Sequence, residues 1–74
     1  MTAHQAFYFS VGDIVVHHKT MGFYRVLCFA KVEATLEEVV VYMEVSSRGN
    51  ELPKSKIWTR PLNEFCDGRF GWVQ

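Results

Sequence analysis

Residues 23–32 read FYRVLCFAKV and decide the fold that the sequence predicts. Aromatic and β-branched side chains dominate this stretch, and they favour a pleated strand. Side chains alternate along a strand, so one face would carry residues 24, 26, 28, 30 and 32 and the other the residues between them. Both faces are largely apolar, which is typical of a long, bent strand that serves both halves of a small barrel.

The segments on either side of this stretch also favour strands. Residues Val11–His18 predict a first strand, and Lys19–Gly22 a turn in which Gly22 takes a positive φ. Residues Thr35–Glu38 have the spacing of a helix-capping box, which offers a helical alternative. The three consecutive valines that follow favour a turn over Thr35–Glu38 and a strand over Val39–Val45.

The second half of the chain predicts a loop, two short strands and one helical turn. Residues 46–56 contain glycine, asparagine and proline without apolar periodicity, which predicts an exposed, solvated loop. Ile57–Arg60 is a predicted strand, and Pro61 would begin a short helical turn that points Leu62 and Phe65 inward. Arg69–Val73 could add a last strand. The fold class predicted is mainly β, a small SH3-like β-barrel of four to five strands with one short helical turn.

Length and composition predict one small domain without a strong charge. The 74 residues form a single domain, 1–74, with residues 1–8 as a loose N-terminal tail. Eight Lys and Arg balance eight Asp and Glu, so the basic footprint of a non-specific nucleic-acid binder is missing. Two cysteines and the lack of a secretion-signal pattern favour a cytoplasmic location. No membrane association is expected, and the chain is expected to be a monomer or weak homodimer.

Three motifs occur in a fixed order: GFYRV at 22–26, TLEEVVVY at 35–42 and WTRPLNEF at 58–65. On these motifs the chain resembles, over about residues 11–66, the small bacterial and phage family called domain of unknown function 1653. That family usually carries an arginine and a second tyrosine after the position of Tyr42, where this chain has Met43 and Glu44. The resemblance implies the fold and marks residues of interest, but it implies no reaction.

The most interesting candidate site is the pair Trp58 and Arg60, which point to the same side of an extended chain. A guanidinium beside an indole can hold a flat or anionic group. Tyr42 would complete an aromatic wall, with Tyr24 at its edge. The predicted ligand-binding residues are Trp58, Arg60, Tyr42, Tyr24, Glu37 and Glu38. The alternative is that the aromatic rings only pack in the core and that Arg60 pairs with Glu37, Glu38 or Glu64.

The leading hypothesis is therefore a non-enzymatic module that binds a protein segment or a small anionic or nucleotide-like ligand. One alternative is single-stranded nucleic acid, held by the same aromatic rings with Arg48, Lys54 and Lys56. Another is a protein-contact adaptor that acts through loop 46–56 and the exposed edge of the valine strand. No phosphate-binding loop or nucleophile elbow occurs, so no catalytic residue and no cofactor is expected.

The histidines and cysteines do not have the spacing of a metal site. His17 and His18 are neighbours on a predicted strand and would face opposite sides, so they do not share an ion with His4, Cys28 or Cys66. Cys28 is expected to be a buried core thiol. Cys66 is expected to be partly exposed, with no base to activate it.

Overall fold

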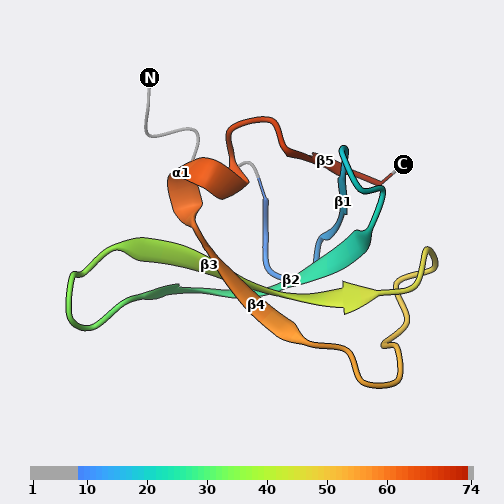
Figure 1. Cartoon of the computed structure of the whole chain (residues 1–74), viewed down its shortest axis with the longest axis horizontal. Helices are drawn as coiled ribbons and strands as arrows, with labels where there is room; N and C mark the ends of the chain where they lie inside the picture. The colour runs from blue at the N-terminus through green and yellow to red at the C-terminus, as the bar shows by residue number, and fades with distance from the viewer. Residues whose placement is uncertain (1–8, 74) are drawn as a thin grey trace.

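The computed structural model describes residues 9–73, which form one antiparallel sheet of five strands with a short helix (Figure 1). The elements are β1 (Ile14–His17), β2 (Phe23–Lys31), β3 (Glu38–Val45), β4 (Ile57–Pro61), α1 (Leu62–Phe65) and β5 (Phe70–Trp72). The predicted mainly β class with five strands and one helical turn is confirmed. No helix in this part of the chain is long and apolar enough to cross a membrane. The predicted tail, residues 1–8, lies outside the described residues.

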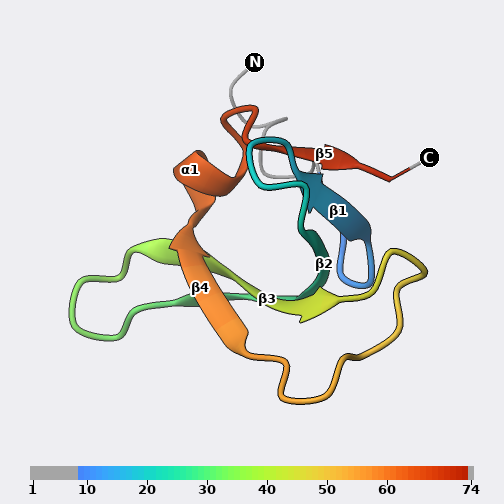
Figure 2. The same ribbon diagram turned by 45° about the vertical axis from the view of Figure 1, so that its right-hand side comes forward.

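The sheet is open, so the predicted closure into a barrel is not found. Its strand order is β4-β3-β2-β1-β5, which makes β4 and β5 the two edges. Within residues 9–73 no ladder joins these edges. The sheet nevertheless curls strongly, and α1 with the segment after it runs from one edge to the other (Figure 2). The valine strand β3 lies between β2 and β4, so its predicted exposed edge does not exist.

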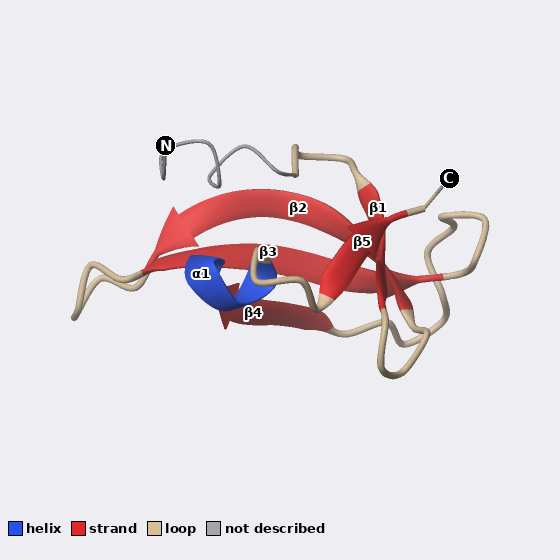
Figure 3. Ribbon diagram, turned by 90° about the horizontal axis from the view of Figure 1, so that it is seen from above, coloured by secondary structure: helices blue, strands red, loops and turns tan. Residues whose placement is uncertain are grey.

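Strand β2 bends at a β-bulge. The register with β3 shifts between Val26 and Cys28, which leaves Leu27 as the extra residue. A bulge bends its strand and interrupts the alternation of side chains, and β2 is visibly curved in Figure 3. Beyond the bulge Phe29, rather than Cys28, continues the face of Val26. The prediction of Cys28 as a core thiol is therefore wrong, because Cys28 is exposed.

The hairpin between β2 and β3 confirms a turn at Thr35–Glu37, while Glu38, predicted in the turn, already belongs to β3. The Val32 N–H donates to the Glu37 carbonyl at 2.9 Å, and the Glu37 N–H donates to Thr35 Oγ1 at 3.2 Å. Leu36 takes a positive φ of 63° at the tip. The helical alternative is wrong because the valines that follow pair along the whole of β3.

Two local predictions about special residues differ from the structure. Met21, not Gly22, has the positive φ in the first turn, at 63°. Gly22 instead lies close to the Tyr24 ring, since a Cβ there would lie 3.0 Å from the Tyr24 hydroxyl. Pro61 does not begin the helix but ends β4, with an extended ψ of 139°. Proline is tolerated at this position because β4 is an edge strand.

The core is a cluster of aromatic rings and valines under the curl of the sheet. Phe65 is fully buried and stacks on Phe70, with ring centroids 4.2 Å apart. Phe9 meets the Phe65 ring edge-on with centroids 5.3 Å apart, and the centroid of the Tyr42 ring lies 5.1 Å from that of Phe65. Cys66 directly follows α1 and also lies in the core, where it is 8% exposed. The expectation of a partly exposed Cys66 is wrong for that reason.

The loop over residues 46–56 is mostly exposed but is tied to the sheet. Gly49 is buried with a φ of 84°, and its carbonyl accepts a hydrogen bond from the guanidinium of Arg25. Further along, Ser55 Oγ donates to the Glu44 carbonyl at 2.8 Å. Residues Val45 and Glu51 form an isolated bridge. These contacts give the long connection a defined path from β3 to β4.

Candidate functional site

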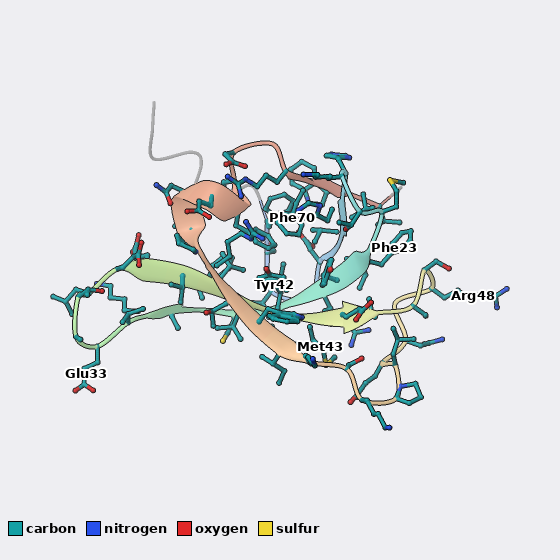
Figure 4. The ribbon with its side chains drawn as sticks, viewed as in Figure 1. Phe23, Glu33, Tyr42, Met43, Arg48 and Phe70 are labelled. Carbon is teal, nitrogen blue, oxygen red and sulfur yellow. The ribbon has the colours of Figure 1, made fainter. Side chains whose placement is uncertain are left out.

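The three leading site residues lie on adjacent rungs of one sheet face. Tyr42 on β3 pairs directly with Trp58 on β4, and Val40 pairs with Arg60. Directly opposed residues of antiparallel strands share a face, and residues two apart on one strand share it too. Trp58, Arg60 and Tyr42 therefore project to the same side, which is the inner side of the curl. Tyr42 and Phe70 lie within this curl in Figure 4.

Arg60 is held from three directions. Its Nε donates to the Tyr42 hydroxyl at 3.3 Å, and one terminal nitrogen lies 3.6 Å from Glu64 Oε1. Its guanidinium carbon is 5.6 Å from the centre of the Phe70 ring, within cation–π range. The hydrogen bond to Tyr42 is the largest of the effects that raise the pKa of Arg60, so the positive charge here is permanent.

Trp58 and Tyr42 play different roles in spite of facing each other. Tyr42 is only 5% exposed, as expected for a core aromatic ring, and its hydroxyl accepts the hydrogen bond from Arg60. Trp58 is 46% exposed, so much of its indole is open to solvent. Lys56 places its ammonium 5.9 Å from the centre of the indole. The alternative that the aromatic rings only pack in the core therefore holds for Tyr42, whereas the Trp58 indole is open to a ligand.

Tyr24 belongs to the same group of rings. It meets Tyr42 edge-on with centroids 5.4 Å apart, and Phe70 at 6.0 Å. Burial and then the nearby Glu44 carboxylate raise the pKa of the Tyr24 phenol. A tyrosine hydroxyl is protonated at neutral pH in any case, and the raised pKa of Tyr24 extends that state to higher pH.

The structure does not bring the Glu37–Glu38 turn to this group. Glu38 pairs in the ladder with Lys31 and lines a hollow of about 250 Å³ with Phe29 and Leu62 at the base of the hairpin. Of the three carboxylates proposed for Arg60, only Glu64 forms the ion pair within residues 9–73. Glu64 has this place because α1 begins right after β4 and sets it four residues beyond Arg60.

The motifs that predicted the site lie on these same elements: TLEEVVVY covers the hairpin and β3, and WTRPLNEF covers β4 and α1. A family model described as a protein of unknown function (DUF1653) matches residues 13–69. The chain belongs to the DUF1653 family. The match includes Tyr24, Tyr42, Trp58 and Arg60. Searches among curated proteins and among solved structures gave no match to this chain.

Two further residues of this DUF1653 chain join the site without having been predicted. Phe70 reaches Arg60 because β5 pairs with β1, where His17 lies opposite it. Arg69 lies 3.8 Å from Glu64 and 3.0 Å from Asp67, so it shares the carboxylate of Arg60. The Phe70 contact depends on pairing between distant strands, whereas the Arg69 contacts lie within five residues and depend on how the chain turns after α1.

The histidines of the DUF1653 chain have ordinary structural surroundings. His17 packs edge-on against Phe70 with centroids 4.9 Å apart, and its Nδ1 accepts a long 3.4 Å hydrogen bond from the Thr20 N–H. His18 lies against Gly71, close to where a Cβ would be. The described part of the chain contains no group of three or more His, Cys, Asp or Glu side chains that could hold a metal. His4 lies outside the described residues.

The reversed exposure of the two cysteines gives a simple prediction. Cys28 is exposed, whereas Cys66 is buried and its thiol pKa is raised by burial. Because the thiolate is the reactive form, we expect a thiol reagent such as DTNB to label Cys28 at least about tenfold faster than Cys66. Cys28→Ser should remove the fast phase and Cys66→Ser should leave it. Equal labelling rates in the folded protein would contradict the placement of β2 and α1.

Proposed function

We propose that this domain is a non-enzymatic binding module that takes an anionic ligand on its Trp58–Arg60 surface, made of Trp58, Arg60, Tyr42 and Tyr24. The observation that carries the proposal is the half-exposed indole beside a guanidinium held in place by Tyr42 and Glu64. Large exposed aromatic side chains and arginines are the residues that most often anchor a partner. An arginine that is already oriented loses less side-chain entropy when it binds.

The chemistry of this surface favours recognition over catalysis. Its acid and base groups are already paired with each other, Glu64 with Arg60 and Arg69, and the Tyr42 hydroxyl with Arg60. A guanidinium offers several donors to a carboxylate or phosphate. The indole offers an apolar plate at its side. These features support a ligand that carries a negative charge next to an apolar or flat group.

The architecture supports the SH3-like description as a further part of the proposal. A four-stranded antiparallel meander, followed by one helical turn and a last strand that returns to β1, is the arrangement expected of such a small barrel. Rings from β3, α1 and β5 fill the space that a closed ladder would enclose. This analogy is one of fold, and the binding role is argued from the residues of the Trp58–Arg60 surface.

Two substitutions test the proposed surface. Trp58→Ala and Arg60→Gln should each lower the free energy of unfolding by only about 1–2 kcal/mol, because neither side chain is fully buried. Both should weaken binding at least about tenfold. The measurement is an NMR titration of the ¹⁵N-labelled domain with N-acetylglutamate, adenosine monophosphate and the peptide acetyl-Glu-Thr-Val-Thr-Glu-amide. Arg48→Gln, on the exposed loop, is the matched control.

The titration has a clear negative outcome. If none of the three probes shifts the indole N–H of Trp58 or the Nε–H of Arg60, the anionic-ligand proposal fails. A large loss of stability in Arg60→Gln with unchanged binding would instead make Arg60 a purely structural residue.

Single-stranded nucleic acid is the second candidate, and one contact favours it: Lys56 lies over Trp58, a pairing of cation and ring that suits base stacking beside phosphate. Two observations weigh against it. Tyr42 is too buried to stack on a base, and Arg48 points away from the surface at the loop tip (Figure 4). A dT oligonucleotide added to the panel should bind with a steep salt dependence if this candidate is right.

A further inference from the structure

Strand β4 is an edge with an unusual composition. It pairs with β3 alone and is the outermost strand on its side of the sheet (Figure 3). Exposed strand edges are normally protected from pairing by lysine, proline or a cover. In β4 the charged and proline residues stand at the two ends, where Lys56 precedes the strand and Arg60 and Pro61 end it. Between them lie Ile57 and Trp58, which are 61% and 46% exposed.

Hydrogen bonds elsewhere in the sheet show which backbone groups of β4 face outward. The Glu44 carbonyl accepts from Ser55 on the β4 side of β3. Backbone groups alternate in direction along a strand, so the N–H and C=O of Tyr42 also point toward β4. On the β1 side of β2, the Gly22 carbonyl accepts from the His17 N–H. The alternation, followed from Gly22 along β2 and across the ladder to β3, again points the backbone groups of Tyr42 toward β4. The groups of Trp58, which pairs with Tyr42, therefore face β3.

It follows that the N–H and C=O groups of Ile57 and Thr59 point away from the sheet. Pro61 has only a carbonyl to offer on that side, since proline has no N–H. The edge therefore offers two complete rungs to another extended chain. Such rungs supply affinity through main-chain hydrogen bonds, while neighbouring side chains supply specificity.

Charge favours an acidic segment over other occupants of this edge. Lys54 and Lys56 are exposed at the start of β4, and neither has an ion-pair partner in the described part of the chain. At the other end Arg60 shares the single carboxylate of Glu64 with Arg69. The excess of positive charge lies beside Trp58, the most accessible ring of the site.

We propose that β4 binds an extended peptide segment bearing acidic residues, which adds as a further strand. Its backbone pairs with Ile57 and Thr59, its acidic side chain lies beside Lys56, and an alternate apolar side chain covers Trp58. This inference rests on the proposed binding function and specifies its ligand class.

A second copy of this chain fits the edge less well. In a two-fold antiparallel pair of β4 strands centred on Trp58, Lys56 of each copy would lie opposite Arg60 of the other. Like charges directly opposed across strands are destabilising. An acidic peptide meets the same two cations with attraction instead.

The test uses acetyl-Glu-Thr-Val-Thr-Glu-amide, whose glutamates and central valine lie on one face of an extended chain, the same peptide with lysine in place of glutamate, and the glutamate peptide methylated at every backbone nitrogen. The ¹⁵N-labelled domain is titrated with each. The glutamate peptide should shift the amides of Ile57 and Thr59 and the indole of Trp58. We expect at least fivefold weaker binding of both control peptides, since one lacks the charge and the other lacks the N–H donors.

Two variants test the backbone part on the protein side. Thr59→Pro removes an outward N–H without touching the ladder to β3, and it should weaken binding of the glutamate peptide at least fivefold. Thr59→Val keeps that N–H and should bind like the unmodified chain. If Thr59→Pro does not fold, the methylated peptide provides the same comparison on the unmodified chain.

Three outcomes overturn the inference. The first is equal binding of the methylated and unmethylated peptides; if Trp58 and Arg60 still respond, the proposed function survives and only strand addition fails. The second is that no peptide or other anionic probe moves Trp58 or Arg60, in which case both fail together. The third is movement of the Ile57 and Thr59 amides on dilution without peptide, which would make a second copy the occupant.

Discussion

Replacing Phe65 with alanine is expected to lower the free energy of unfolding by about 3–5 kcal/mol, the usual range for a fully buried phenylalanine. Phe65 has no exposed surface and contacts Phe9, Tyr42 and Phe70 through its ring. It is therefore the residue through which α1 joins the sheet. A domain of this size has a total stability of roughly 4–11 kcal/mol, so much of it would be lost. Urea denaturation followed by tryptophan fluorescence measures the change.

Phe29 provides the matched control for this substitution. It is 42% exposed on the far half of β2, so Phe29→Ala removes the same atoms from a site that is only partly covered. We expect a loss of about 1 kcal/mol or less there, in proportion to the smaller buried area. Similar losses at the two positions would mean that Phe65 is not the centre of the core.

Tyr42→Ala should have a comparable effect, about 3–5 kcal/mol, because its ring is 5% exposed and lies against Tyr24, Phe65 and Phe70. This prediction differs from the first because Tyr42 also carries a polar group. Its hydroxyl accepts the hydrogen bond from Arg60. The alanine variant should therefore lose both the packing of the core and the support of the Trp58–Arg60 surface.

Tyr42→Phe separates these two contributions. It keeps the ring and removes only the hydroxyl, so the expected loss of stability is about 0.5–1.5 kcal/mol. The affinity for the glutamate peptide should fall by more than this small loss of stability would produce, since Arg60 loses the hydrogen bond that orients it. Thermal melts and the peptide titration on the same two variants give both quantities. Wild-type affinity in Tyr42→Phe would show that the hydroxyl has no part in the site.

Most of the strands could be predicted from the sequence because the deciding residues are local. The three valines before Tyr42 favour a strand whatever their surroundings, and they outweigh the capping-box spacing of Thr35 and Glu38. Pairing of Tyr42 with Trp58 followed from two adjacent strands in the expected order. The open sheet was not predicted, because closure depends on how far the edges curl, and no single residue type records that.

The errors come from features that only the assembled sheet fixes. A single extra residue, Leu27, reverses the alternation of β2 and exposes Cys28. No turn residue or proline marks this bulge in the sequence. Cys66 is buried because it follows Phe65 at the end of a helix that docks on the core. Strand alternation therefore misplaces Cys28, and the local sequence around Cys66 does not show that the helix carries it into the core.

The site was predicted in part for a similar reason. Trp58 and Arg60 are two residues apart on one strand, so their common face needs only a local rule. Choosing among Glu37, Glu38 and Glu64 as the partner of Arg60 required the direction of the hairpin and the start of α1, which are properties of the whole fold. Phe70 comes from β5, and its role depends on pairing with β1 across most of the chain.

The pairing of β1 with β5 also has a consequence for the order in which the protein folds. Strands β1, β2 and β3 each pair with the next strand along the chain, and such local contacts form quickly. The last ladder joins residues 15–17 to residues 70–72 and must close a far longer loop. The meander of β1 to β4 is therefore expected to form first, and its rings stay uncovered until β5 docks on β1 and brings Phe70 into the core.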